Sequence, residues 1–204
     1  MINNIIFDIG GVILHWDINE MINYFVSDEE DKKFIYNKIF DTEEWVGGLL
    51  DKGSISQYDF IKIIQEKTDH KKDNLVETFI LNYYKMYHVK DDVIDIMKLL
   101  KERGYKVYVL SNINDYTEEK INAKNFLDII DGYVLSYQVH EIKPDEHIYK
   151  ILIDKYNLNP KESLFIDDVL ENIIAANKLG INGRTVEKNS TEDILNILKE
   201  YKVI

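Results

Sequence analysis

The sequence predicts an α/β protein in which helices cover a parallel β-sheet and one long all-helical segment interrupts the chain. Two observations predict the sheet: five short β-rich runs recur along the sequence, and segments with helical periodicity separate them. A third observation predicts the helical segment, because strand-like runs are missing between about residues 17 and 88. With 204 residues, 45% of them hydrophobic, the chain can form one domain or one domain carrying an insert.

The strands and their covering helices can be placed in chain order. The predicted strands are residues 5–7, 107–110, 133–135, 164–166 and 184–186. Between them, apolar residues recur at helical spacing in residues 93–100, with Gly104 as a natural stop, and again in residues 194–201. Residues 76–83 show the same spacing within the strand-free segment. Because that segment is too long for a simple crossover, we expect residues 17–88 to form an all-helical insert.

The composition narrows the classes of function. A formal net charge of −12 and a pI near 4.9 argue against a nucleic-acid partner, because a phosphate backbone needs a basic face. The absence of cysteine excludes disulfides and thiolate chemistry, and no apolar run approaches the thickness of a bilayer. The first residues lack the basic and apolar regions of a signal peptide, so we expect a cytoplasmic protein without a membrane partner.

Polar side chains follow the predicted strands, at the edge of the sheet where ligands of open parallel sheets bind. In chain order they are Asp8; Ser111 and Asn112; Lys143, in the loop past the third strand; and Asp167 with Asp168. Three carboxylates at close range repel one another and require a cation, and ligation by oxygen alone suits Mg²⁺. A metal beside serine, asparagine and lysine side chains describes a site for phosphate.

Each of these residues also has a purely structural interpretation. Asp8 before two glycines is typical of a turn, and Ser111 or Asn112 is an equally good N-cap for the next helix. Lys143 taken alone is a solvated lysine, and paired aspartates such as Asp167 and Asp168 are common at helix N-termini. The prediction of a site therefore rests on the combination, in which each group follows its strand in the same chain.

At these positions the sequence resembles the haloacid dehalogenase superfamily, whose members are mostly phosphatases. The four motifs of that superfamily are matched by Asp8 in "FDIGGV", Ser111 in "LSN", Lys143 in "KP", and Asp167 with Asp168 in "IDD". The resemblance implies a three-layer α/β/α Rossmann-like core domain from residues 1–16 and 89–204, with a helical cap domain at residues 17–88. Residues 45–60 also resemble the cap of the sugar-phosphate phosphatase branch, in particular enzymes similar to α-D-glucose-1-phosphate phosphatase.

The resemblance implies a mechanism for these residues. Asp8 would be the nucleophile that forms an acyl phosphate, which water then cleaves. Mg²⁺ would bind Asp8, the backbone carbonyl of Gly10 and Asp167, while Asp168 completes the metal site and orients Lys143 or a bound water. The phosphoryl oxygens would be held by Ser111, Asn112 and Lys143, and Lys143 would also serve the catalytic step.

Gly10 departs from the pattern of most phosphatases in this superfamily, which carry a second aspartate at this place as general acid and base. A missing proton donor reduces the rate by a factor of about 10² to 10⁴. The sugar-phosphate phosphatase branch also shows glycine here, so we still expect catalysis. Three nearby groups are possible substitutes for the missing donor, although a structural role is expected for each: His15, Asp17 and Glu171.

Three functions remain open from the sequence. The leading one is a Mg²⁺-dependent phosphatase for a small phosphorylated metabolite, for example a sugar 1-phosphate. The second is a metal-independent 2-haloacid dehalogenase, in which the paired aspartates would have no task, and the third is a non-catalytic phosphate-binding protein, which Gly10 favours. The sequence does not name the substrate, and for the assembly we expect a monomer or a weak homodimer.

Overall fold

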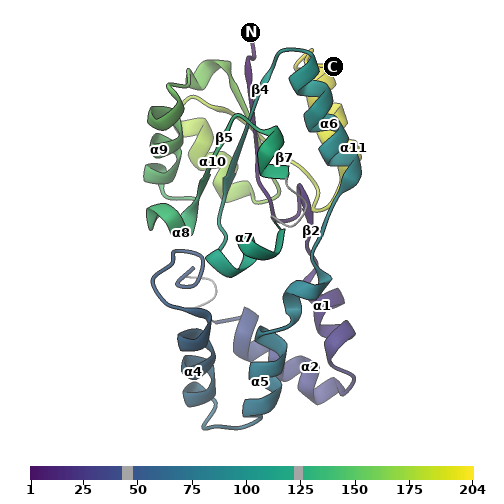
Figure 1. Ribbon diagram of the computed structural model, residues 1–204, viewed down its shortest axis with the longest axis vertical. Coiled ribbons are helices and arrows are strands. Elements are labelled where there is room, and N and C mark those ends of the chain that lie inside the picture. Colours follow the sequence, from purple (N-terminus) through teal and green to yellow (C-terminus); the bar gives the residue numbers. More distant parts are fainter. Residues whose placement is uncertain (43–47, 122–125) are drawn as a thin grey trace.

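The computed structural model describes residues 1–42, 48–121 and 126–204, and it confirms the predicted α/β fold class (Figure 1). Its main sheet has five parallel strands in the order β5-β4-β1-β6-β7. Their bounds are β1 Asn4–Phe7, β4 Lys106–Ser111, β5 Gly132–Leu135, β6 Ser163–Asp167 and β7 Asn182–Thr185. All five overlap the predicted strands, although the prediction for the last strand was placed about two residues too late at its start.

Helices cover both faces of this sheet, so the core has three layers. Successive strand residues point to opposite faces, and Ile5 and Phe7 accordingly pack in one apolar cluster while Ile6 packs in another. The first cluster is covered by α6 (Asp91–Glu102) and α11 (Thr191–Glu200), and the second by α9 (Glu146–Tyr156) and α10 (Leu170–Lys178) (Figure 1). Shorter helices complete the core: α7 Asp115–Ile121, η4 Phe126–Ile129, α8 Ser136–Val139 and η5 Pro160–Glu162.

The insert between β1 and β4 folds around an apolar cluster of its own, which is contributed by residues 21–83. Its described elements are α1 Ile18–Phe25, α2 Glu29–Ile35, the π-helix η1 Tyr36–Phe40, α4 Gln57–Lys67, α5 Asp73–Ile80 and the 3-10 helix η2 Tyr83–Met86. These helices lie at the opposite end of the molecule from the N-terminus (Figure 1). Residues 45–47, which open the segment that resembles a sugar-phosphate phosphatase cap, lie outside the described residues.

A short two-stranded ribbon joins the insert to the core. Strand β2 (Leu14–His15) pairs antiparallel with β3 (His88–Val89), so the chain enters and leaves the insert side by side. The predicted domain boundaries, after residue 16 and after residue 88, fall at this ribbon, and the division into two domains stays a prediction.

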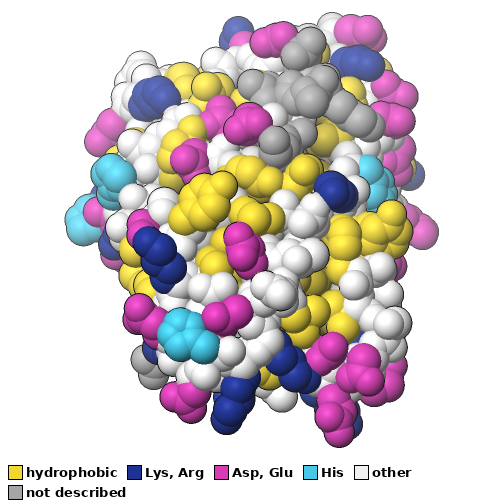
Figure 2. Space-filling model, turned by 60° about the horizontal axis from the view of Figure 1, so that its bottom comes forward, with side chains coloured by type: hydrophobic (Ala, Val, Ile, Leu, Met, Phe, Trp, Pro, Cys, Tyr) yellow, Lys and Arg dark blue, Asp and Glu magenta, His cyan; other side chains and the backbone are white. Residues whose placement is uncertain are grey.

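The surface of the insert end is a mixed, solvated face. Figure 2 shows basic side chains scattered among acidic and apolar ones on this side of the molecule. In the described parts of the chain, none of the helices combines the length and apolar character needed to span a membrane.

Candidate active site

A buried ion-pair cluster lies where β1 and β6 end. The Lys143 ammonium donates hydrogen bonds to Asp8 Oδ1 at 2.7 Å and to Asp167 Oδ2 at 2.7 Å, and its third bond goes to the Leu110 carbonyl at 3.0 Å. Asp8 is 7% exposed, Asp167 is 0% exposed and Lys143 is 4% exposed, so water screens their charges weakly. One ammonium therefore faces two carboxylates in a largely dry environment.

The register of the sheet explains why these acids meet. Phe7 of β1 is paired with Ile166 of β6, so Asp8, which follows β1, and Asp167, the last residue of β6, lie at the same edge of the sheet. The backbone N–H of Asp8 also donates to the Ile166 carbonyl at 2.9 Å, which extends the ladder by one step. The prediction that strand-end residues converge follows from this parallel pairing.

Asn112 clamps the backbone of Lys143. Its side-chain Nδ2 donates to the Lys143 carbonyl at 2.9 Å, and its Oδ1 accepts from the Lys143 N–H at 2.8 Å. The structure therefore gives this side chain a positioning role that the sequence did not suggest, and its role as a phosphate ligand stays a prediction. Its neighbour Ser111, at the end of β4, is buried and is not among the described residues that line the cavity above the cluster.

The structural alternatives for Ser111 and Asn112 can also be checked. The N-cap of α7 is formed by Asn114, whose Oδ1 accepts from the Thr117 N–H at 2.8 Å, so neither Ser111 nor Asn112 caps that helix. A side chain two residues further along thus performs the capping role.

Further contacts hold the aspartate pair after β6. Asn172 Nδ2 donates to both carboxylate oxygens of Asp167, at 3.1 and 3.0 Å, and the Val169 N–H donates to Oδ1 at 2.8 Å. Asp168 points toward Lys188, 4.0 Å away, and its carboxylate occupies the space beside Gly11. Asp167 is thus fixed from several sides, whereas Asp168 lies at the cavity wall.

The charges in this cluster shift one another's protonation. Burial raises the pKa of Asp8 to about 7; Lys143 opposes this shift, whereas Asp167 and Asp168 add to it. Burial likewise raises the pKa of Asp168. For Lys143, burial disfavours the charged form, but the two neighbouring carboxylates outweigh it and raise the pKa.

The cluster fits a divalent cation. Oxygens of Asp8, Asp167 and Asp168 lie within 4.8 Å of one another. The three carboxylates outnumber the two ammonium groups near them, Lys143 beside Asp8 and Asp167 and Lys188 at 4.0 Å from Asp168. Gly10 lines the same cavity, and its backbone carbonyl accepts no hydrogen bond from any described residue. A cation at this place would lower the pKa of Asp8 and keep it ionised, and hard oxygen ligands are the ones that Mg²⁺ prefers.

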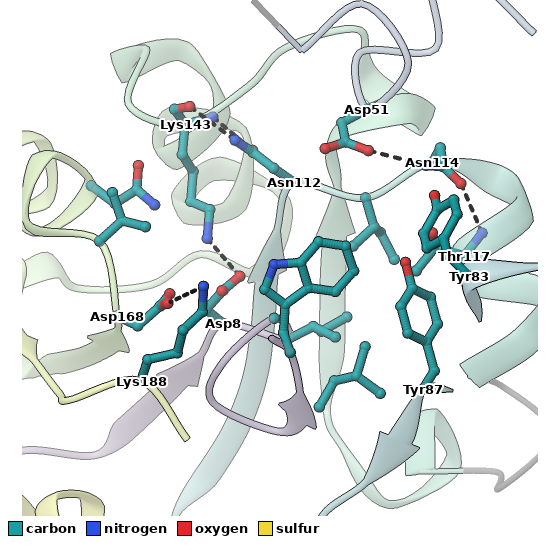
Figure 3. A pocket seen from close by; sticks show the side chains of 17 residues that line it. Asp8, Asp51, Tyr83, Tyr87, Asn112, Asn114, Thr117, Lys143, Asp168 and Lys188 are labelled. Carbon is teal, nitrogen blue, oxygen red and sulfur yellow. Dashed lines mark hydrogen bonds and ion pairs between the residues drawn. The ribbon is translucent and has the colours of Figure 1, made fainter. Parts of the chain in front are cut away.

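A cavity of about 230 Å³ opens above the cluster (Figure 3). Asp8, Lys143, Asp168 and Lys188 lie on one side of it in this view. The other side carries a second group of polar side chains, here called the distal cluster: Asp51, Tyr83, Tyr87, Asn114 and Thr117. A ligand in the cavity is therefore in reach of several charged groups at one end and, at the other, of hydroxyl and amide groups together with the single carboxyl of Asp51.

Asp51 is the charged residue of the distal cluster, and it was not identified as a site residue from the sequence. It comes from the insert, and the core holds it through two bonds: Asn114 Nδ2 donates to its carboxylate at 3.1 Å, and the Ser136 hydroxyl donates to its carbonyl at 2.5 Å. Burial raises its pKa to about 7, although the Asn114 bond acts in the opposite direction. Asp51 follows no strand, so strand-end reasoning had no means of placing it.

The three substitutes considered for the missing donor are not among the described residues that line the cavity. His15 pairs with Glu20 at 2.7 Å and stacks on His88. Asp17 is the N-cap of α1, and Glu171 is exposed in the first turn of α10. His15, which was expected in a turn, lies instead in strand β2, whereas Asp17 stands at the entry to the insert and Glu171 on a helix surface, as expected.

Fold and site together define a hydrolase class, and the chain belongs to it: residues 2–180 match the haloacid dehalogenase-like hydrolase family. A D-ribitol-5-phosphate phosphatase of Bacteroides thetaiotaomicron is 28% identical over 193 residues, covering 88% of this chain and 89% of the relative. A sesquiterpene phosphatase of Aspergillus oryzae is 25% identical, with 87% and 86% covered. A HAD family enzyme from Bacteroides thetaiotaomicron, solved in complex with magnesium and inorganic phosphate, has a TM-score of 0.75 at 26% identity, with 96% of this chain and 99% of that chain covered.

Proposed function

We propose that this protein is a Mg²⁺-dependent phosphatase that hydrolyses a small phosphorylated metabolite through an aspartyl-phosphate intermediate on Asp8. The observation that carries the proposal is the group of three neighbouring carboxylates beside a cavity, of which Asp8 and Asp167 are buried and bonded to Lys143 while Asp168 lies at the cavity wall. Such a set repels an anionic substrate unless a divalent cation joins it. The phosphatase names of the relatives and the magnesium and phosphate in the similar structure support the same function.

The metal would be held by the carboxylates of Asp8, Asp167 and Asp168 together with the carbonyl of Gly10. When bound, Mg²⁺ supplies positive charge that offsets the repulsion between the attacking carboxylate and the phosphoryl oxygens. Asn172 contributes indirectly, because its bonds to both oxygens of Asp167 fix the orientation of that ligand.

The residues of the chain then divide the remaining work. A carboxylate oxygen of Asp8 attacks phosphorus, the bond to the leaving oxygen breaks, and water later cleaves the acyl phosphate. Lys143 stays fixed by Asn112 and places its ammonium where charge accumulates on the phosphoryl group. Ser111 is proposed as a further ligand of the phosphoryl oxygens.

The distal cluster suits a leaving group that carries hydroxyls, because its amide and hydroxyl groups pair with a sugar or polyol better than with a hydrocarbon. We therefore propose a phosphorylated sugar or sugar alcohol as the substrate class, of which a sugar 1-phosphate is one member. One relative is named for a phosphorylated sugar alcohol.

A phosphate-release screen tests the function. Purified protein is incubated with a panel of sugar phosphates, polyol phosphates and 4-nitrophenyl phosphate, once with Mg²⁺ and once with excess chelator. We expect release with Mg²⁺ only, and no release from Asp8→Asn with any substrate.

Two results would contradict the proposal. Turnover that survives thorough metal removal, in particular halide release from 2-haloacids, would favour the dehalogenase function. Phosphate that binds without any turnover would favour the non-catalytic phosphate-binding function.

A further inference from the structure

We propose that Asp51, from the insert, is the general acid and base of the reaction and takes the place of the side chain that Gly10 lacks. This inference rests on the proposed phosphatase function, which it deepens by naming a further catalytic residue. It is carried by the position of Asp51 in the same cavity as Asp8 and by the hydrogen bonds that hold it there.

The loop after β4 connects the two ends of the cavity. Asn112 clamps Lys143, which binds Asp8, and Asn114 binds Asp51. Two residues of extended chain span at most about 7 Å, so the residues that position the nucleophile and Asp51 are close neighbours. Figure 3 shows Asp8 and Asp51 on opposite sides of the same cavity. The proposed role requires that the leaving oxygen of a phosphoryl group on Asp8 faces the distal cluster, which lies across the same cavity.

The backbone of Asp51 is anchored as well as its side chain. The Ser136 hydroxyl accepts from the Ile113 N–H at 2.9 Å and donates to the Asp51 carbonyl at 2.5 Å, which ties the insert to the core loop. An acid-base group needs such preorganisation, because it must meet the leaving oxygen in one geometry.

The protonation of Asp51 suits both halves of the reaction. With its pKa raised by burial to about 7, it is present in acid and base forms at neutral pH. Tyr83 and Tyr87, which face it, have pKa values raised by burial and stay neutral. Across the cavity lie Asp8, Asp168, Lys143 and Lys188. A bound phosphoryl dianion adds negative charge, raises the pKa further and favours the protonated acid before the first step.

The proton can be followed through both steps. As an oxygen of Asp8 forms its bond to phosphorus, the phosphorus–oxygen bond of the ester breaks and the Asp51 carboxyl gives its proton to the leaving oxygen, which releases the alcohol. In the second step the Asp51 carboxylate takes a proton from water as the water oxygen attacks phosphorus. The bond between phosphorus and Asp8 then breaks, which releases phosphate and returns both aspartates to their initial states.

Gly10 offers a matched way to restore the donor. An added Cβ there would meet no heavy atom within 4 Å, and the backbone is outside the left-handed region, so neither the backbone nor the first side-chain carbon opposes Gly10→Asp. A carboxyl at that position would lie beside Asp8, as in most phosphatases that the chain resembles.

Single-turnover rates on two kinds of ester test the proposal. A sugar-alcohol phosphate has a poor leaving group and needs a proton, whereas 4-nitrophenyl phosphate leaves without one. We expect Asp51→Asn to lower the rate on the sugar-alcohol phosphate by about 10²-fold or more and the rate on 4-nitrophenyl phosphate by less than about tenfold. Gly10→Asp in the same background should restore most of the lost rate, and Asp17→Asn and Glu171→Gln should behave as the wild type.

The pH profile supplies a second readout that a structural role would not move. The wild-type rate on the sugar-alcohol phosphate should fall as the pH rises past about 7, where Asp51 loses its proton. Asp51→Asn should lose this limb. Asn114→Ser keeps a side chain that can cap α7 but removes the amide that lowers the pKa of Asp51, so the limb should move to higher pH.

The inference and the proposed function fail in different ways. Equal losses on both esters in Asp51→Asn, or a Gly10→Asp variant that restores nothing, overturn the role of Asp51 while wild-type turnover and the inactivity of Asp8→Asn leave the function standing. If Asp51→Asn does not fold, Asn114→Ser provides the test: a fall of the rate at the same pH as in the wild type overturns the role of Asp51 as acid and base. A wild type that releases no phosphate from either ester overturns the function itself.

Discussion

Adding one methyl group at Gly11 should damage the site, while the same change at Gly10 should not. Gly11 has φ of +71°, in the left-handed region, whereas Gly10 does not adopt such a conformation. A Cβ at Gly11 would lie 2.6 Å from Asp168 Oδ2 and 3.1 Å from Lys188 Cγ, so both side chains must move away. The two neighbouring glycines therefore form a matched pair for one perturbation.

The expected magnitude follows from these two effects. A non-glycine residue in the left-handed region costs roughly 1 to 2 kcal/mol, and alanine in an ordinary conformation costs nothing comparable. We expect Gly11→Ala to lower the free energy of unfolding by about 1 to 2 kcal/mol, and Gly10→Ala to change it by less than about 0.5 kcal/mol. Because Asp168 is displaced from the carboxylate set, Gly11→Ala should also weaken Mg²⁺ binding by roughly tenfold.

Urea unfolding followed by circular dichroism measures the first effect, and the rise of the melting temperature with Mg²⁺ measures the second. Gly10→Ala serves as the control in both. The reasoning is refuted if Gly11→Ala is as stable as Gly10→Ala, or if it retains wild-type Mg²⁺ affinity, because Asp168 would then not depend on the space beside Gly11.

Three further predictions concern individual side chains. In Asp167→Asn, the Mg²⁺-dependent rise of the melting temperature should largely disappear; an undiminished rise would place the metal elsewhere. In Asn112→Ala, the loss of the clamp on Lys143 should lower stability by about 1 to 2 kcal/mol and kcat by more than tenfold with little change in KM, and an unchanged kcat would contradict the positioning role. In Asp51→Asn, stability should lose part of its pH dependence. Because the folded pKa of Asp51 is raised to about 7, the wild type becomes less stable relative to this variant as the pH rises from about 4 to 8, by roughly 4 kcal/mol, and a constant difference would contradict the raised pKa.

The sequence was informative wherever a functional residue directly follows a strand. Asp8 and Asp167 could be brought together from the pattern alone, because parallel neighbours end at one edge and the residue after each strand shares that edge. The role of Asn112 was harder, since an amide has a donor and an acceptor and its partners depend on a loop 31 residues away. Adjacency in sequence to Ser111 suggested a ligand, and tertiary structure made it a clamp on Lys143.

The position of Asp51 in the cavity could not be predicted from the sequence. The chain contains 37 acidic residues, and most of them are solvated, so nothing in the sequence distinguishes one functional aspartate in the helical insert from the others. What distinguishes Asp51 is the Asn114 amide and the Ser136 hydroxyl, which approach it from positions 63 and 85 residues away. Only the packing of the insert on the core brings these partners together, and periodicity within either part does not report on it.

The ribbon of β2 and β3 determines how the insert can be replaced during evolution without disturbing the core. Because His15 and His88 are paired, the residues between them are joined to the core at two adjacent positions. A longer, shorter or different insert can therefore be attached there without altering the strand order of the sheet. Exchange of modules at such a junction ordinarily alters selectivity and leaves chemistry intact. Here Asp51 lies within the exchangeable module, so a graft that replaces the insert without an acid at this place, or without restoring one at Gly10, should yield a protein that still captures phosphate esters but turns them over slowly. With the role proposed for Asp51, the insert would determine both selectivity and turnover.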